Sequence, residues 1–107
     1  MLLSARPVEQ RLQFTVPHHY SRAEARARTQ HLLEYWDHRY GIKSVWQGDR
    51  AYLAGHAWGV YFDGIVDVTD REVRGTASDP GYFLRSTALD YVTRKMRKYL
   101  HPQYLEP

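Results

Sequence analysis

The first pattern in the chain is an alternation of apolar and polar positions. Leu12, Phe14 and Val16 are apolar, and the residues between them are polar. A period of two predicts a half-buried β-strand over residues 11–16. Pro17 and the polar residues after it predict the end of this strand.

A helical pattern follows the strand. Ser21-Arg22-Ala23-Glu24 has the form of a capping box, in which the side chains of Ser21 and Glu24 each accept a hydrogen bond from the other's backbone N–H. We expect the helix to run to Tyr40 and Gly41 to end it. Small or apolar residues recur at spacings of three and four, which predicts one buried stripe. This stripe consists of Ala25, Thr29, Leu32, Trp36 and Tyr40.

Residues 42–78 are typical of β-structure, because aromatic and β-branched residues alternate there with polar ones between turn-forming residues. The pattern predicts an antiparallel meander with one solvated face. The expected strands are Val45-Trp46 and residues 50–57, 58–68 and 72–77, with turns at Gln47-Gly48-Asp49, Gly55–Gly59 and Thr69-Asp70-Arg71. In the longest strand, one face is predicted to hold Trp58, Val60, Phe62, Val66 and Val68, and the other Tyr61, Asp63, Ile65 and Asp67.

A second helix is expected over residues 80–100, with Asp79 as its N-cap and Pro80 as its first residue. Leu89, Val92 and Met96, with Tyr99 or Leu100, define its apolar side. The predicted fold class is therefore α+β, in the order β-α-β-β-β-β-α. We expect a two-layer sandwich, with two helices on one face of an antiparallel sheet of about five strands, as in helix-grip folds.

Composition narrows the class of protein. The chain has 107 residues, which is the size of one domain, and we expect it to cover residues 10–101 between tails at 1–9 and 102–107. The absence of cysteine excludes disulfides and Cys-ligated metals. No apolar run is long enough to span a membrane, and the first residues do not resemble a signal peptide. We therefore expect a cytoplasmic protein.

Candidate catalytic and metal sites are weak. His31, Glu34 and His38 share a helix face, but this spacing is also typical of solvated residues, so we expect no metal. Asp63 and Asp67 lie about 13 Å apart along a strand, farther than paired catalytic carboxylates. The glycines of Gly55–Gly59 match no nucleotide-binding fingerprint. We expect no cofactor and a non-enzymatic protein.

A basic cluster near the end of the chain indicates nucleic-acid binding as one alternative function. The cluster consists of Arg94, Lys95, Arg97 and Lys98. Such residues contact phosphates, but they also complement the dipole at the end of a helix. The net charge is only +3, from 15 basic and 12 acidic residues, and this argues against a nucleic-acid groove.

Several segments together resemble a known family. These are Ala23-Glu24-Ala25-Arg26, Tyr40-Gly41, Trp46-Gln47-Gly48-Asp49, Gly64-Ile65-Val66-Asp67-Val68 and Tyr99-Leu100. The chain is similar to the small polyhydroxyalkanoic acid system proteins, named for genes found beside polyester-granule genes in bacteria. The resemblance implies association with the granule surface or with granule proteins, and it carries over no catalytic residue.

Two sets of residues are candidates for binding. An aromatic, half-solvated sheet face often becomes an interface, either with a second copy in a homodimer or with the granule. The interface candidates are Tyr52, Tyr61, Ile65 and Tyr99. Alternatively, a curved sheet could leave a pocket for an acyl chain or another small hydrophobic ligand. The pocket candidates are Trp46, Trp58, Phe62 and Met96.

Overall fold

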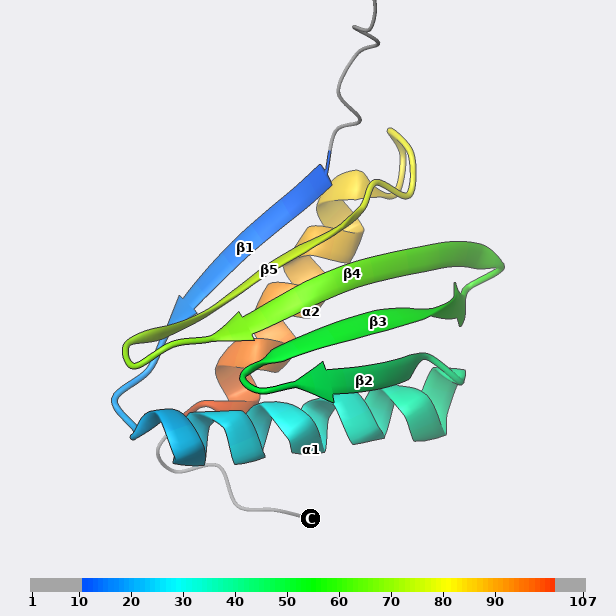
Figure 1. Cartoon of the computed structure of the whole chain (residues 1–107). Coiled ribbons are helices and arrows are strands. Elements are labelled where there is room, and N and C mark those ends of the chain that lie inside the picture. The colour runs from blue at the N-terminus through cyan, green and yellow to red at the C-terminus, as the bar shows by residue number, and fades with distance from the viewer. Residues whose placement is uncertain (1–10, 102–107) are drawn as a thin grey trace, which may run out of the picture.

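The computed structural model describes residues 11–101 and contains the predicted elements in the predicted order (Figure 1). They are β1 (Arg11–Pro17), α1 (Arg22–Tyr40), β2 (Lys43–Gln47), β3 (Arg50–Ala57), β4 (Val60–Val68), β5 (Glu72–Ser78) and α2 (Arg85–Tyr99). The strands form one antiparallel sheet in the order β1-β5-β4-β3-β2. The predicted α+β class is confirmed. The predicted tails lie outside the described residues.

Both helices pack on one face of the sheet, which we call the inner face. Its core residues include Val16, Val66 and Val73, which meet Leu32 of α1 and Met96 of α2. All five side chains are at most 4% exposed. The apolar positions of each strand therefore point to the helices, as the alternation in the sequence predicts.

The ends of α1 follow the predicted caps in part. The Ser21 hydroxyl accepts a hydrogen bond from the backbone N–H of Glu24 at 3.1 Å. Gly41 ends the helix in the left-handed region, at φ 76°. The Glu24 carboxylate, however, accepts a hydrogen bond from Nε of Arg28 at 3.1 Å. Only the Ser21 half of the predicted capping box is therefore seen.

The start of α2 differs from the prediction, because the helix begins at Arg85 and not at residue 80. Asp79 does not cap it. Its carboxylate accepts hydrogen bonds from the backbone N–H of Gly81 at 2.9 Å and from Nε of Arg85 at 2.8 Å. Gly81 has a φ of 106°, which a helix cannot contain. Residues 79–84 therefore form a loop between β5 and α2.

The β3–β4 connection also differs from the prediction. Ala57 pairs with Val60, so Trp58 and Gly59 form a two-residue turn and Trp58 is not part of a strand. Both residues have positive φ, 54° and 74° respectively. Turns of this kind favour Asn or Gly, so the bulky Trp58 is a conformational outlier.

The end of the sheet where α1 begins is held together by charged groups. Nε of Arg22 donates to Asp70 at 2.9 Å, and its Nη1 donates to Asp49 at 3.2 Å. Asp49 lies in the β2–β3 turn and Asp70 follows β4, so one arginine links the helix to two turns. The Arg22 guanidinium lowers the pKa of the Asp70 carboxyl by hydrogen bonding.

Candidate functional site: an apolar pocket and an aromatic end

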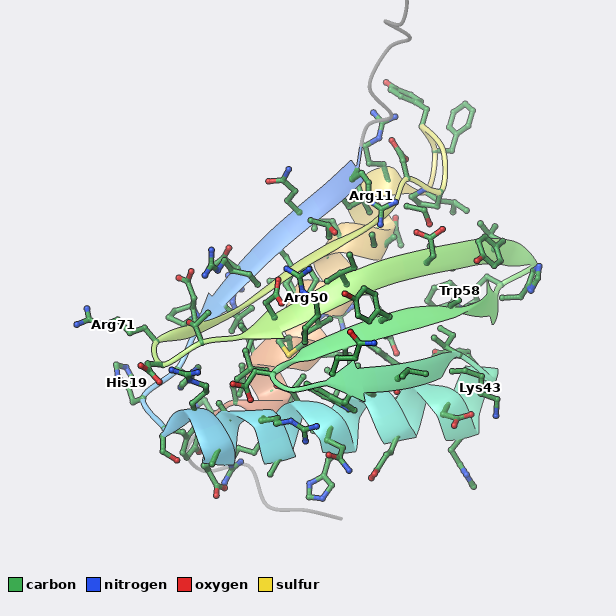
Figure 2. The ribbon with its side chains drawn as sticks, in the orientation of Figure 1. Arg11, His19, Lys43, Arg50, Trp58 and Arg71 are labelled. Atoms are coloured by element: carbon green, nitrogen blue, oxygen red, sulfur yellow. The ribbon has the colours of Figure 1, made fainter. Side chains whose placement is uncertain are left out.

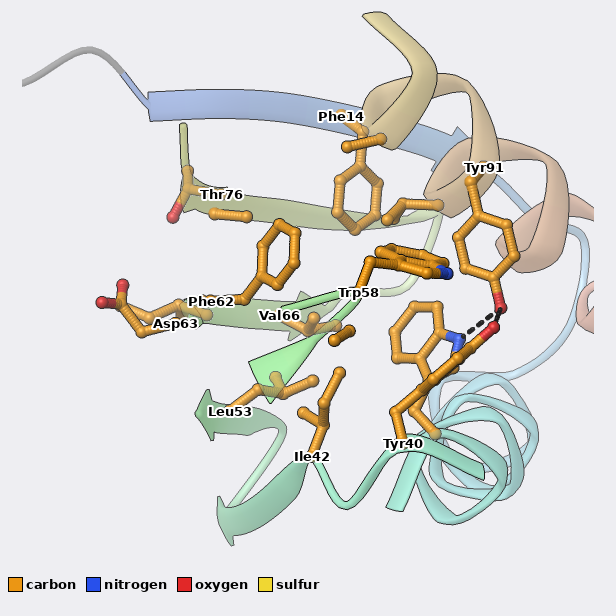
Figure 3. Close-up of a pocket in the computed structure, with 17 residues that line it drawn as sticks. Phe14, Tyr40, Ile42, Leu53, Trp58, Phe62, Asp63, Val66, Thr76 and Tyr91 are labelled. Atoms are coloured by element: carbon orange, nitrogen blue, oxygen red, sulfur yellow. Dashed lines mark hydrogen bonds between the residues drawn. The ribbon is translucent and has the colours of Figure 1, made fainter. Parts of the chain in front are cut away.

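A cavity of about 90 Å³ lies between the inner face of the sheet and the two helices (Figure 3). It extends from Phe14 on β1 across Phe62 on β4 to Leu53 on β3, and Trp36 and Tyr91 bound it from the helices. Its accessible lining is apolar. The curved sheet and the two helices thus leave unfilled volume in a domain of this size.

Small residues leave this space open. Gly64, Ala57 and Ala77 supply the strand positions next to the cavity, and Ala88 supplies a helix position. A Cβ atom on Gly64 would come within 2.7 Å of the backbone oxygen of Thr76. A larger residue at position 64 therefore conflicts with the neighbouring strand, and the two strands can approach only because this position is glycine.

Trp58 covers one side of the cavity. Its ring stands edge-on to Phe62 and Tyr91, with ring centroids 6.2 and 5.4 Å away, and lies 5.2 Å from the ring of Tyr40. Nevertheless 58% of Trp58 is exposed to solvent. The residue therefore forms a partial cover between the cavity and water.

Three polar atoms meet beside the cavity. Nε1 of Trp36 donates to the Tyr91 hydroxyl at 3.2 Å, and the hydroxyls of Tyr91 and Tyr40 are 3.4 Å apart, as the dashed lines in Figure 3 show. Burial is the main cause that raises the pKa of Tyr91, to about 12. Tyr91 therefore stays protonated at neutral pH and acts as a neutral hydrogen-bonding group.

A second feature is the concentration of exposed aromatic residues at one end of the sheet. The loop between β5 and α2 and the β3–β4 turn both lie at this end, opposite the Arg22 bridge (Figure 1). Phe83 is 90% exposed, and Tyr82 is 77% exposed. We define the aromatic end as Trp58, Tyr61, Tyr82, Phe83 and Leu84, all of which are exposed.

Three basic residues at the aromatic end lie against carboxylates. Arg11 lies 3.1 Å from Asp63, and Arg85 lies 2.8 Å from Asp79. Lys43, at the same end of the sheet in Figure 2, lies 2.8 Å from Asp37. The exposed side chains of the aromatic end are therefore apolar, and these three cations beside them are each balanced by a carboxylate.

The outer face of the sheet, turned away from the helices, carries three of the interface candidates. Tyr52 and Ile65 are direct cross-strand partners, whereas Tyr61 is already part of the aromatic end. Arg50, which lies on this face in Figure 2, forms a double hydrogen bond with Asp67 at 2.6 and 2.9 Å. The outer face is thus a mixed surface, in which the two apolar residues lie among ion pairs.

Three other predicted site residues lie elsewhere. Tyr99 is only 6% exposed in the core, so its ring is not available as an interface and that expectation is wrong. Met96 is fully buried and does not line the cavity. Trp46 packs beneath Arg26, whose guanidinium carbon lies 4.0 Å from the centroid of the Trp46 ring. Trp46 also lies outside the cavity. Of the four pocket candidates, only Trp58 and Phe62 line it.

The predicted basic cluster is partly engaged with neighbours. Lys95 lies 4.9 Å above the ring of Tyr35, and Arg94 forms an ion pair with Asp90 at 3.5 Å. Arg97 and Lys98 are exposed in the last turn of α2. These positions complement the helix dipole.

Two further candidate features of residues 11–101 are a metal site and a membrane-spanning helix. No three His, Asp or Glu side chains in this range come together as a metal site. No helix in the described part of the chain combines the length and apolarity that a membrane crossing requires.

Comparison with known proteins adds a family. The sequence model of one protein family, the polyhydroxyalkanoic acid system proteins, matches residues 12–103, which is most of the chain. The chain belongs to this family. Searches among curated proteins and among solved structures found no match.

Sequence reasoning missed the loop that carries Tyr82 and Phe83, the most exposed large apolar side chains among the described residues of this polyhydroxyalkanoic acid system protein. The sequence predicts a helix over residues 80–100, which includes Tyr82, Phe83 and Leu84 in its first turns, whereas the structure has them in a loop. Three consecutive apolar residues directly after Pro80-Gly81 were the available signal, because that dipeptide is typical of a turn.

Proposed function

We propose that this protein binds the surface of polyester granules through its aromatic end. The observation that carries this proposal is the exposure of Tyr82 and Phe83, which project from a short loop, contact each other edge-on and remain 77% and 90% exposed. Large exposed apolar groups usually mark contact surfaces. Membership of the polyhydroxyalkanoic acid system family supports a polyester as the contact partner.

The shape of the aromatic end suits a hydrophobic surface. Four of its five residues come from two connections, the β3–β4 turn and the loop 79–84, and Tyr61 lies at the start of β4. The connections can reach a surface before the rest of the sheet does (Figure 1). Burying one phenylalanine side chain contributes roughly 1.5–3 kcal/mol. Two or three such side chains would be sufficient for reversible adsorption.

The paired charges favour an uncharged surface over an anionic membrane. Arg11, Lys43 and Arg85 each lie against a carboxylate at this end of the molecule. Binding should therefore depend little on ionic strength, whereas attraction to anionic lipids weakens as salt screens the charges.

The test is adsorption of the purified protein to polyhydroxybutyrate particles, measured by co-sedimentation. We expect Phe83→Ser to reduce the affinity roughly tenfold or more, since it removes the most exposed apolar side chain. A rise in NaCl from about 0.05 to 0.5 M should leave wild-type binding nearly unchanged. Equal adsorption by wild type and Phe83→Ser would refute the proposal.

Tyr52→Ser is the matched control, because Tyr52 is exposed on the outer sheet face and away from the loop. If Tyr52→Ser or Ile65→Asp loses binding and Phe83→Ser does not, the sheet face is the contact surface. The same variants test homodimer formation through that face, with sedimentation equilibrium as the measurement. Anionic phospholipid vesicles in place of polyester, and duplex DNA, complete the comparison of partners.

A further inference from the structure

The size and the lining of the cavity beside Trp58 indicate which kind of ligand it could hold. Its volume of about 90 Å³ is below the ~150 Å³ of an apolar cavity that admits benzene. It therefore suits an aliphatic segment of roughly four carbons and not a long acyl chain. Its apolar lining indicates a ligand whose buried part is hydrocarbon.

Hydrogen-bond counting identifies a polar group that such a ligand should carry. Trp36 Nε1, Tyr40 Oη and Tyr91 Oη together bear three hydrogens, and the two contacts among these atoms use two of them. Whichever tyrosine donates to the other, one hydroxyl hydrogen remains for another acceptor. The accessible lining of the cavity is apolar, so an acceptor can meet this hydrogen only at the edge of the cavity and not inside it. A ligand whose carbonyl oxygen lies at that edge would supply the acceptor.

The charge around the cavity selects a neutral ligand. Among the described lining residues there is no Lys, Arg or His, and Asp63 is the one charged residue. A carboxylate in this cavity would lose its hydration without gaining a cation, which is costly. An ester keeps the carbonyl acceptor and avoids that cost.

The conformation of Trp58 adds an independent observation. Its positive φ of 54° is unfavourable for a side chain of this size, yet the turn holds it over the cavity. Strained residues tend to occur where a ligand is held or enclosed. A glycine or asparagine would form the same turn more easily.

We propose that this cavity binds the acyl part of a small neutral ester of about four carbons, with the ester carbonyl at the edge of the cavity, where it accepts a hydrogen bond from the Tyr40–Tyr91 pair. Trp58 covers the bound acyl group. This inference goes beyond granule adsorption. Trp58 belongs to both sites, but the loop 79–84 does not line the cavity, so variants in that loop and variants in the cavity test the two proposals separately.

The experiment is titration of the ¹⁵N-labelled protein with methyl butyrate, followed by NMR. We expect saturable shifts at the indole N–H groups of Trp36 and Trp58, with the remaining shifts confined to the lining residues. Sodium butyrate is the matched charged probe and should bind at least tenfold more weakly. Methyl octanoate tests the size limit and should also bind weakly.

Three variants of the pocket and one control variant separate binding in the pocket from nonspecific binding. Ala77→Val fills the cavity and should abolish saturable binding, and Ala88→Val is the second filling variant in case the first disturbs the sheet. Tyr91→Phe removes a hydroxyl and should weaken binding about three- to tenfold. Tyr52→Phe removes a hydroxyl from the outer face and should leave the affinity unchanged.

Absence of saturable shifts in folded wild-type protein would overturn the proposal. Equal binding of methyl butyrate and butyrate, or binding unchanged in both filled variants, would also overturn it. Adsorption of the Phe83→Ser variant to particles is measured separately. Loss of ester binding with intact adsorption therefore rejects this inference alone, and the reverse result rejects only the proposed granule contact.

Discussion

The indole of Trp58 and the phenol ring of Tyr91 stand perpendicular, with their centroids 5.4 Å apart and an interplanar angle of 89°. This edge-to-face contact joins the β3–β4 turn to α2 across the mouth of the cavity. Such pairs contribute about 0.5–1.5 kcal/mol beyond burial. The contact therefore offsets part of the backbone strain at Trp58, which has positive φ.

The first prediction separates these two contributions. Trp58→Gly removes the aromatic contacts and the strain together, whereas Trp58→Ala removes the contacts and keeps the strain. We expect Trp58→Ala to be less stable than Trp58→Gly by about 1 kcal/mol. Urea unfolding, followed by far-ultraviolet circular dichroism, measures the difference. If the alanine variant is as stable as the glycine variant, the turn does not hold residue 58 at positive φ.

The second prediction concerns alkaline pH. Burial raises the pKa of Tyr91 to about 12, above its ordinary value near 10. Between these values the unfolded chain has lost this proton and the folded protein has not. The contribution of Tyr91 to stability is therefore complete below pH ~10 and is lost as the pH rises toward ~12.

The check is the pH dependence of the unfolding free energy in wild type and Tyr91→Phe. We expect wild type to lose on the order of 1 kcal/mol relative to the variant over this range, since partial solvent exposure reduces the effect. Absorbance at the phenolate band should show one tyrosine that titrates late. Parallel pH profiles for the two proteins would contradict this prediction.

The third prediction concerns the close approach of Phe14 and Gly75. Phe14 and Gly75 are paired across β1 and β5, and the Phe14 ring covers the glycine. A Cβ atom at position 75 would clash sterically with this ring. Gly75→Ala should therefore cost about 1–3 kcal/mol of stability. In the double variant Gly75→Ala/Phe14→Leu the smaller side chain should recover part of the loss, which a double-mutant cycle measures. Additive effects would exclude the steric explanation.

The fourth prediction concerns the start of α1. Ser21→Ala should cost about 1 kcal/mol, because it removes the hydroxyl that caps the backbone N–H of Glu24. Glu24→Ala should cost only ~0.3–0.5 kcal/mol, because that side chain pairs with Arg28 one turn later. Thermal unfolding of both variants provides the comparison. Equal losses would indicate that the full reciprocal capping box forms in solution.

Much of the fold was predictable because local patterns and tertiary packing agree. The alternation at Leu12, Phe14 and Val16 and the Ser21 and Gly41 caps all predict elements that the structure contains. The start of α2 was not predictable in the same way. Asp79-Pro80 is equally suitable as a helix cap and as part of a turn, and the left-handed conformation of Gly81 decides between them.

The candidate site was less predictable than the fold. Periodicity shows that Met96 and Phe62 face the core, but it does not show which of them borders unfilled space. That depends on the small residues Gly64, Ala77 and Ala88, which belong to three different elements. Tyr99 lies in the core cluster, in agreement with its place on the apolar side of the second predicted helix and not with its place among the interface candidates.

The bridge from Arg22 to Asp49 and Asp70 makes the two ends of the domain chemically unlike. A molecule seated by Phe83 and its neighbours would stand upright, with its strands pointing away from the polymer and its charged turns directed into water. A granule coated in this way would acquire a hydrated, ionic shell. Such a shell keeps hydrophobic particles dispersed, because it opposes their coalescence.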